Sequence, residues 1–377
     1  MSFELSAEHL AARERARVLA ERLRHRAEEA DAATELDPVV REALRASRLV
    51  ELAVPAGNGK GAVDPVAVTV VREALMGVSA HLDSMFAMQG VGSYALAAAG
   101  SPDVRGRWLP RIAALDAIAA LALTEPEIGS DLRAVSTRAQ ERGGALVVSG
   151  RKSWITNAGA ADCFTVLCRE GDGHSLVLIP ADTPGLRVEP GPDIIAPHVL
   201  GTVDLDDVRV PQDHRIGAAG GAFPLVLATL ATFRVSVAGA AVGLAQAALE
   251  EAVRHTTSRR QFGTTLDRLG PLPHLLGTSW TEVESARLLT YAAATRAAAD
   301  PKAALHWSSM AKVAATETAG RVVDRCVQMM GRFGLVAGST IERLYRNARP
   351  MRIYEGGNEV LTAQLAKTLT RPLAPKP

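Results

Sequence analysis

The chain has 377 residues, a formal net charge of +1 and 47% apolar residues. These values are ordinary for a globular protein, and they exclude a disordered chain and a disulfide scaffold. The near-zero net charge argues against a protein that coats nucleic acid or a membrane surface. Aromatic residues make up only 4% of the chain, which favours helix-rich packing over a β-sandwich.

The cysteines and the N-terminus bear on the cellular compartment. Only Cys163, Cys168 and Cys326 are present, without a Cys-x-x-Cys pair, so we expect neither a disulfide framework nor a cysteine zinc site. The nine histidines are scattered, and we predict no metal site. No signal-like N-terminus and no run of 18 apolar residues occur, so we expect a cytoplasmic protein without a transmembrane helix.

The elements predicted in chain order fall into three regions. Residues 1–116 have helical spacing of apolar positions, and residues 223–377 are helical again, with a long small-residue helix over 238–253. Residues 117–222 contain short β-rich runs separated by Gly, Pro and Asp, which predict a compact all-β domain. These runs lie at 145–148, 164–167, 175–179, 186–188 and 203–205. Strands and helices do not alternate, and no Gly-x-Gly-x-x-Gly follows a strand, so a dinucleotide-binding α/β fold is not expected.

Two segments carry a more specific signal. Thr-Glu-Pro-x-x-Gly-Ser-Asp begins at Thr124, and Trp-Ile-Thr-Asn begins at Trp154. Each segment alone also fits an ordinary turn beside a strand. Together they resemble the two signature segments of the acyl-CoA dehydrogenase flavoprotein family. Four more family motifs follow in the family's order, at 207–211, 258–263, 328–331 and 346–359, so the resemblance covers nearly the whole chain.

The resemblance implies an α+β multidomain fold with an N-terminal helical domain, a central β-barrel and a C-terminal four-helix bundle. It also implies FAD-dependent removal of an α proton and a β hydride from an acyl thioester. Reduced flavin would pass electrons to an electron-transfer flavoprotein or a similar acceptor. The assembly would be a homotetramer or homodimer, with no nucleic-acid or membrane partner.

Glu355 stands where the family's common catalytic base stands. A carboxylate is a weak base in water, and burial beside an apolar acyl chain should raise its pKa. The other interpretation is a surface glutamate before a helix capped by Asn358. Some relatives take the base from the residue before an arginine, but that residue is Phe233, before Arg234, and a phenyl ring cannot accept a proton.

Other site residues follow from the resemblance alone. Thr124 and Thr156 would bond the isoalloxazine edge, and Trp154 would pack on the ring system. Arg259 and Gln328 would reach the ADP half of FAD from a neighbouring subunit. The full set expected to bind FAD is Leu123, Thr124, Ser130, Trp154, Thr156, Arg259, Phe262, Gln328, Gly331 and Asn358. The set expected to bind substrate is Ser130, Phe233, Arg234, Tyr354 and Gly356; Arg234 could instead be a charge on a helix surface.

The chain departs from the family pattern at three positions. Arg332 follows Gly331 where a second glycine is frequent, and either alters the approach to the pyrophosphate or supplies charge to it. Gly270 replaces a common glutamine, and Gly357 replaces a frequent threonine beside the base. None of these departures removes a required catalytic group.

Several functions stay open at this point. The acyl group could be carried by CoA or, as in secondary metabolism, by a carrier protein, and the enzyme could be an oxidase that uses oxygen directly. Nitroalkane oxidases resemble this family but have Asp at the base position, which Glu355 argues against. A non-catalytic assembly factor or a DNA-associated member is disfavoured by the intact motifs and the balanced charge.

Overall fold

The computed structural model describes residues 5–55 and 63–371. The start and end of the predicted terminal domains, at 1–4 and 372–377, lie outside the described residues. Contacts group the chain into two compact units, each built from separate stretches of sequence. One unit comprises Met1–Asp31, Pro65–Asp83 and Arg234–Pro377, and the other comprises Ala32–Asp64 and Ser84–Phe233. We call them the helical unit and the sheet unit, and the predicted domain boundaries at 116 and 222 stay a prediction.

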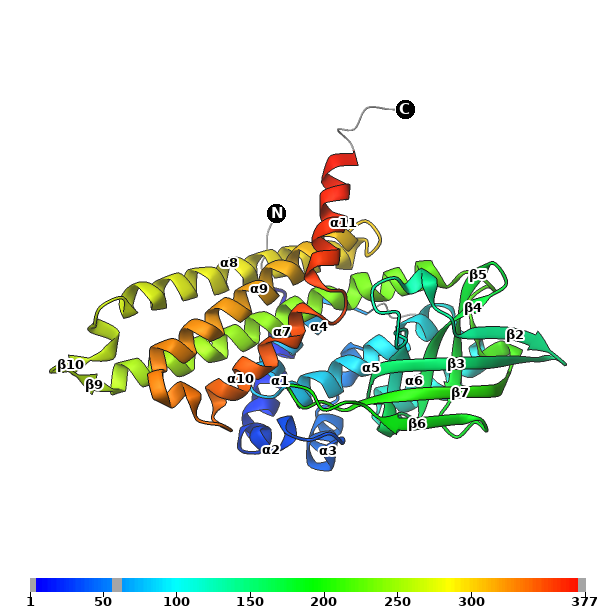
Figure 1. The fold of residues 1–377 in the computed structure, drawn as a ribbon, viewed down its shortest axis with the longest axis horizontal. Coiled ribbons are helices and arrows are strands. Elements are labelled where there is room, and N and C mark those ends of the chain that lie inside the picture. The colour runs from blue at the N-terminus through cyan, green and yellow to red at the C-terminus, as the bar shows by residue number, and fades with distance from the viewer. Residues whose placement is uncertain (1–4, 56–62, 372–377) are drawn as a thin grey trace. The chain divides into compact units, whose positions relative to one another are not determined.

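The helical unit is a bundle of long helices (Figure 1). Its α8 and α9 pack along each other, and α10 and α11 pack on α9. The N-terminal helix begins after Ser6, which forms a capping box with His9. The elements are α1 (Ala7–Leu23), α2 (Ala27–Asp31), α4 (Pro65–Met76), most of α7 (Ala222–Ser258), β9 (Arg260–Gln261), β10 (Thr264–Thr265), α8 (Leu272–Ala299), α9 (Leu305–Met330), α10 (Thr340–Ala348), the short η8 (Pro350–Arg352) and α11 (Asn358–Thr370).

Small residues on α7 let it approach α4 closely within this unit. A Cβ atom at Gly239 would lie 2.6 Å from the carbonyl oxygen of Thr69, and one at Gly243 would lie 1.9 Å from that of Glu73. Both distances are below van der Waals contact, so the backbones touch directly. The small-residue segment predicted over 238–253 is therefore a helix-packing face.

We expect Gly243→Ala to lower the free energy of unfolding by about 1–3 kcal/mol, because the new methyl group overpacks the α4 contact. Gly320→Ala in α9 is the matched control, since its Cβ would meet only Arg352 Cδ at 3.8 Å. That change should be neutral or stabilising by up to about 1 kcal/mol through helix propensity. Chemical denaturation of both variants measures the difference, and equal effects would contradict the close approach.

The sheet unit contains one eight-stranded sheet and its own helices. The strand order is β6-β7-β3-β2-β4-β5-β8, and β1 pairs in parallel with β4. The elements are α3 (Pro38–Ser47), most of α5 (Ala80–Ala99), α6 (Pro102–Ala113), β1 (Ala119–Ala122), β2 (Arg138–Arg142), β3 (Ala145–Thr156), β4 (Cys163–Glu170), β5 (Gly173–Pro180), β6 (Leu186–Pro190), β7 (Leu200–Pro211) and β8 (Arg215–Ile216).

The predicted order of helices, sheet and helices is confirmed, and all five β-rich runs fall within strands β3 to β7. The sequence missed β1, β2 and β8. Strand β1 reads Ala-Ala-Leu-Ala, a composition that favours helix, and only pairing with β4 makes it a strand. Strand β2 is mostly exposed and carries two arginines and a glutamate, so it lacks an apolar pattern.

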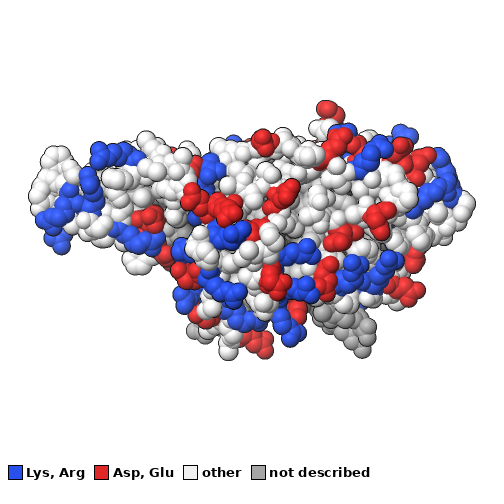
Figure 2. Space-filling view, turned by 90° about the horizontal axis from the view of Figure 1, so that it is seen from below, with Lys and Arg blue, Asp and Glu red and all other residues white. Residues whose placement is uncertain are grey.

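Among the described residues, one helix is long and apolar enough to span a membrane by length and composition. Helix α7 has a window of mean hydropathy 1.8, but 78% of that window is buried within the protein. Burial of this extent is typical of a core helix. On the face shown in Figure 2, basic and acidic side chains are interspersed over much of the surface, in keeping with the net charge.

Candidate active site

Glu355 lies in the turn between η8 and α11, in the helical unit. Its φ of 51° is left-handed, and Gly356 after it has a φ of 105°. Such a conformation costs a non-glycine residue about 1–3 kcal/mol and is typical of functional sites. The carboxylate is half-buried, and its Oε2 is buried without a hydrogen-bond partner among the described residues. An unsatisfied oxygen of this kind is available to a ligand or a proton.

Burial and the neighbouring cations have opposite effects on the pKa of Glu355. Burial raises the pKa of Glu355 above its ordinary value, while Arg72, Arg234 and Lys312 favour the charged form, and the net direction is upward. Arg72 is itself buried in a bidentate pair with Asp83, with N–O distances of 2.9 and 2.7 Å. A carboxylate with a raised pKa and nearby cations can accept a proton near neutral pH.

Two buried cations bind the backbone of the Glu355 turn. Arg234 Nε donates to the carbonyl oxygen of Glu355 at 2.9 Å, and another of its nitrogens donates to Ser309 Oγ at 3.1 Å. Lys312 Nζ donates to the carbonyl oxygen of Gly356 at 2.8 Å and to Asn358 Oδ1 at 2.9 Å. Neither Arg234, at 5% exposure, nor Lys312, at 0%, is a surface charge.

These contacts contradict two of the alternatives left open by the sequence. Arg234 is not a helix-surface charge, and Asn358 does not cap α11, because Gly357 is the capping residue and no side chain caps the helix. Asn358 donates its amide hydrogens to Thr316 and Glu317 at 3.0 and 2.8 Å. No amide hydrogen of Asn358 is left for FAD, so its observed contacts position the turn.

The first signature segment is organised by a buried ion pair in the sheet unit. Glu125 accepts hydrogen bonds from Ser136 N, Ser136 Oγ and Thr137 N at 2.7–2.8 Å. Lys152 Nζ donates to Glu125 at 2.9 Å and to the carbonyl oxygen of Leu123 at 2.9 Å. Burial would raise the pKa of Glu125, but the hydrogen bonds outweigh it and lower the pKa to about 2.

The second signature segment presents an aromatic face and hydroxyl groups. Trp154 has a φ of 59°, and its side chain is 53% exposed. The backbone N–H of Ser153 donates to the carbonyl oxygen of Thr124 at 3.0 Å, so the two signature segments are adjacent. The hydroxyls of Thr124 and Thr156 have no hydrogen-bond partner among residues 5–55 and 63–371. An open indole face beside free hydroxyls fits the ring and polar edge of a flavin.

The expected contacts to the ADP half of FAD lie at one end of the helical unit. Gly331 ends α9 with a φ of 58°, Gln328 is exposed, and Phe262 is 92% exposed. The guanidinium carbons of Arg259 and Arg332 lie 5.3 and 5.2 Å from the centre of the Phe333 ring. Neither arginine has a carboxylate partner in the described part of the chain, and basic side chains gather at this end in Figure 2. This cluster fits an anion such as a diphosphate.

The remaining predicted residues differ in their exposure. Phe233 is 1% exposed and packs edge-on against Tyr94 in the sheet unit, with ring centres 5.9 Å apart. Tyr354 is 37% exposed, and Ser130 is exposed. A groove of about 670 Å³ runs between α8 and α9, and none of the predicted site residues lines it.

The sequence missed the residues that hold the site in place. Arg72, Asp83, Ser309 and Lys312 belong to no motif. Glu125 lies within the first signature segment and Lys152 lies two residues before the second, and neither was assigned a role. One signal could have found the two lysines. The chain has only six lysines and uses arginine almost everywhere else, yet two of the six are fully buried.

Comparisons with known proteins agree with the motifs. Three family models match, described as the acyl-CoA dehydrogenase N-terminal, middle and C-terminal domains, at residues 6–116, 120–208 and 220–370. A probable acyl-CoA dehydrogenase of Mycobacterium leprae is 32% identical, covering 98% of this chain and 97% of the relative. A cyclohex-1-ene-1-carbonyl-CoA dehydrogenase of Geobacter metallireducens is 34% identical, covering 85% and 86%.

Solved structures agree as well. The butyryl-CoA dehydrogenase of Megasphaera elsdenii superposes with a TM-score of 0.92 at 26% identity, and the match covers 98% of this chain and all of that one.

Proposed function

Because this chain belongs to the acyl-CoA dehydrogenase family, we propose that Glu355 is the base that removes the α proton of its acyl thioester substrate. The protein is an FAD-dependent oxidoreductase that acts on CH–CH donors. The observation that carries the proposal is the buried, unpartnered Oε2 of Glu355 beside three cations.

FAD supplies the acceptor for the hydride that leaves the β carbon. The chain's own residues manage the proton. Burial makes Glu355 a stronger base than a carboxylate in water, and Arg72, Arg234 and Lys312 keep enough positive potential nearby for the ionised form to exist. The backbone N–H of Glu355 polarises the thioester carbonyl, which acidifies the α proton.

The flavin contacts are part of the same proposal. Trp154 packs on the ring system, and Leu123, Thr124, Ser130 and Thr156 bind around it. Arg259, Phe262, Gln328 and Gly331 bind the ADP half. The site for the substrate is lined by Phe233, Arg234, Tyr354 and Gly356. Three observations support these assignments: the exposed indole of the sheet unit, the Thr124 and Thr156 hydroxyls, and the Arg259 and Arg332 side chains, the last two sets having no partner of the kind described above within the described residues.

The partners are proposed on similar grounds. A homotetramer or homodimer is supported by apolar side chains exposed at the end of the helical unit that carries β9 and β10, where Phe262, Leu335 and Val336 are all more than half exposed. An electron-transfer flavoprotein or similar acceptor reoxidises the enzyme, which works in the cytoplasm. The acyl carrier is CoA, as in the names of the relatives.

The test is anaerobic titration of the purified holoprotein with a panel of thioesters, following the visible absorbance of FAD. The panel contains butyryl-CoA, a branched acyl-CoA, cyclohex-1-ene-1-carbonyl-CoA and the matching acyl-carrier-protein thioesters. We expect bleaching by at least one acyl-CoA. Bleaching by carrier-protein thioesters alone would show that the acyl carrier is a carrier protein and not CoA. A flavin that no thioester bleaches would contradict the proposed function.

A further inference from the structure

We propose that Lys312 is a positioning residue for the catalytic turn, holding Glu355 and Gly356 in their left-handed conformation. This inference rests on the proposed function, because it concerns how the base Glu355 is held. Lys312 belongs to none of the sequence motifs, and it lies 43 residues before Glu355 in the sequence, on α9.

Lys312 binds the backbone of the turn directly. Its ammonium donates to the carbonyl oxygen of Gly356 at 2.8 Å, while Arg234 donates to that of Glu355 at 2.9 Å. A trans peptide is planar, so fixing a carbonyl oxygen also fixes the N–H of the next residue on the opposite side. Arg234 therefore orients the N–H of Gly356, and Lys312 orients that of Gly357.

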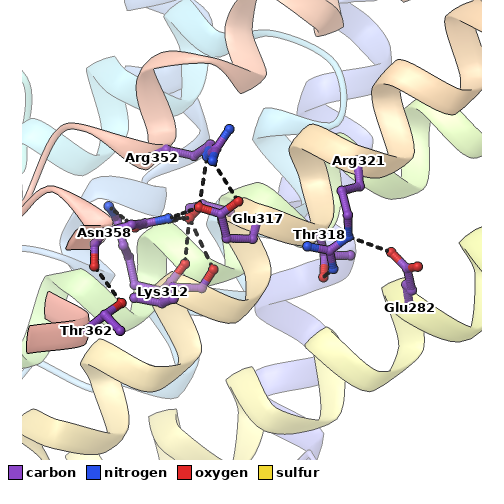
Figure 3. Close-up of polar contacts among 10 residues, drawn as sticks. Glu282, Lys312, Glu317, Thr318, Arg321, Arg352, Asn358 and Thr362 are labelled. Carbon is purple, nitrogen blue, oxygen red and sulfur yellow. Dashed lines mark hydrogen bonds and ion pairs between the residues drawn. The ribbon is translucent and has the colours of Figure 1, made fainter. Parts of the chain in front are cut away.

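A hydrogen-bond network extends from the buried Lys312 to the partly exposed pair of Glu317 and Arg352 (Figure 3). Asn358 accepts from Lys312 and donates to Glu317 at 2.8 Å, and Glu317 accepts from Arg352 Nε at 2.9 Å. The network thus joins α9, η8 and the first residue of α11, on both sides of Glu355. Lys312 is fully buried, so water does not compete for its hydrogen bonds.

The strained backbone explains why such a contact is needed. Glu355 would leave a φ of 51° for a more favourable region if nothing held it. Two charge-assisted hydrogen bonds to successive carbonyls oppose that relaxation. A catalytic group displaced by about 1 Å loses roughly 100-fold in rate.

Lys312 also acts on Glu355 through its charge. The charged groups around Glu355 are Arg72 on α4, Asp83 on α5, Arg234 on α7 and Lys312 on α9. Lys312 faces Glu355, Arg234, Glu317 and Glu359, and burial lowers its pKa to about 8. It is therefore mainly protonated at neutral pH. Its removal takes away one cation that favours the ionised carboxylate, so the pKa of Glu355 rises further.

The experiment measures the rate of flavin reduction by the best acyl-CoA from pH 5 to pH 9 for the wild-type holoenzyme and three variants. We expect Lys312→Met to retain FAD, to be slowed about 100-fold, and to have its acid limb moved up by about one pH unit. Lys312→Arg keeps the charge, but the larger planar guanidinium cannot reproduce the position and tetrahedral donor geometry of the ammonium. It should be slowed at least about tenfold, with its acid limb unmoved.

Arg321→Met is the matched control. Arg321 lies on the same helix and pairs with Glu282 at 3.2 Å, so its loss removes an ion pair from α9 without touching the turn. It should change neither rate nor pH profile. If Lys312→Met does not fold, Lys312→Arg tests the proposal, and an unchanged rate of flavin reduction in that variant overturns it.

Two other outcomes are distinguishable. If acyl-CoA reduces the wild-type flavin, and Lys312→Met reduces it at a rate within threefold of the wild type and with the same pH profile, only the role of Lys312 is overturned. A wild-type flavin that no acyl-CoA reduces overturns the proposed function as well.

Discussion

Replacing Glu355 with glutamine is expected to slow reduction of FAD by acyl-CoA by about 10²- to 10⁴-fold, the contribution typical of a general base. Glutamine has nearly the same size and can occupy the same turn, but its amide cannot accept the α proton. FAD content and thermal stability should stay close to those of the wild type. Stopped-flow absorbance of the flavin under anaerobic conditions measures the rate.

A second measurement separates proton removal from hydride transfer. A 3,3-dimethylbutanoyl thioester has α hydrogens but no β hydrogen, so it can exchange α protons with deuterated water without reducing FAD. The wild type should catalyse this exchange, seen by proton NMR, and Glu355→Gln should not. Glu359→Gln is the control, since Glu359 is exposed four residues later and should behave as wild type. Rapid exchange or reduction in Glu355→Gln would eliminate Glu355 as the base.

The raised pKa of Glu355 also sets the direction of the pH dependence. The base must be ionised, so the rate should fall as the pH drops through a pKa above the ordinary value of 4.5. This acid limb should be absent from the residual rate of Glu355→Gln. An identical limb in both proteins would assign it to another group.

Replacing Lys152 with methionine is expected to cost about 3–5 kcal/mol of unfolding free energy, because it leaves the buried carboxylate of Glu125 without its cation. Lys152 is 0% exposed and Glu125 is 3% exposed. The change also frees the carbonyl oxygen of Leu123, so FAD affinity should fall too. Chemical denaturation and FAD retention on dilution measure the two effects.

The double variant Lys152→Met/Glu125→Gln tests the cause of that loss. It removes the unpaired charge, so it should recover part of the stability lost in Lys152→Met. The acid response of the wild type follows from the same carboxylate. Its pKa is depressed to about 2, so its contribution is complete above about pH 4.5 and is lost as the pH falls towards 2. A double variant no more stable than Lys152→Met would argue against a charge effect.

The sequence predicted the fold class and five of the eight sheet strands, and it singled out Glu355 as the candidate base, because each of these depends on local patterns. Strand runs such as 175–179 are apolar over their own length, and Glu355 lies in a contiguous motif. The sequence did not predict Arg72, Asp83 or Lys312. Arg72 and Asp83 are 11 residues apart on different helices, and Lys312 meets Gly356 across 44 residues, so only tertiary packing reveals these pairs.

Asn358 likewise has side-chain contacts that its sequence neighbours do not indicate. An asparagine at the start of a helix usually caps it, and the resemblance placed this one among the cofactor ligands. Its side chain bonds to Lys312, Thr316 and Glu317. Those partners lie more than 40 residues away and cannot be inferred from the residues around Asn358.

The left-handed backbone at Glu355 has a consequence for how this position can evolve. Glycine and asparagine adopt a φ of 51° more readily than glutamate does, and neither brings a buried carboxylate that must be kept charged. Folding alone would therefore favour one of those residues here, and catalysis alone favours glutamate. Selection for stability and selection for catalysis therefore favour different residues at this position. Relatives released from catalysis should drift towards glycine or asparagine at this position before they lose the surrounding helices.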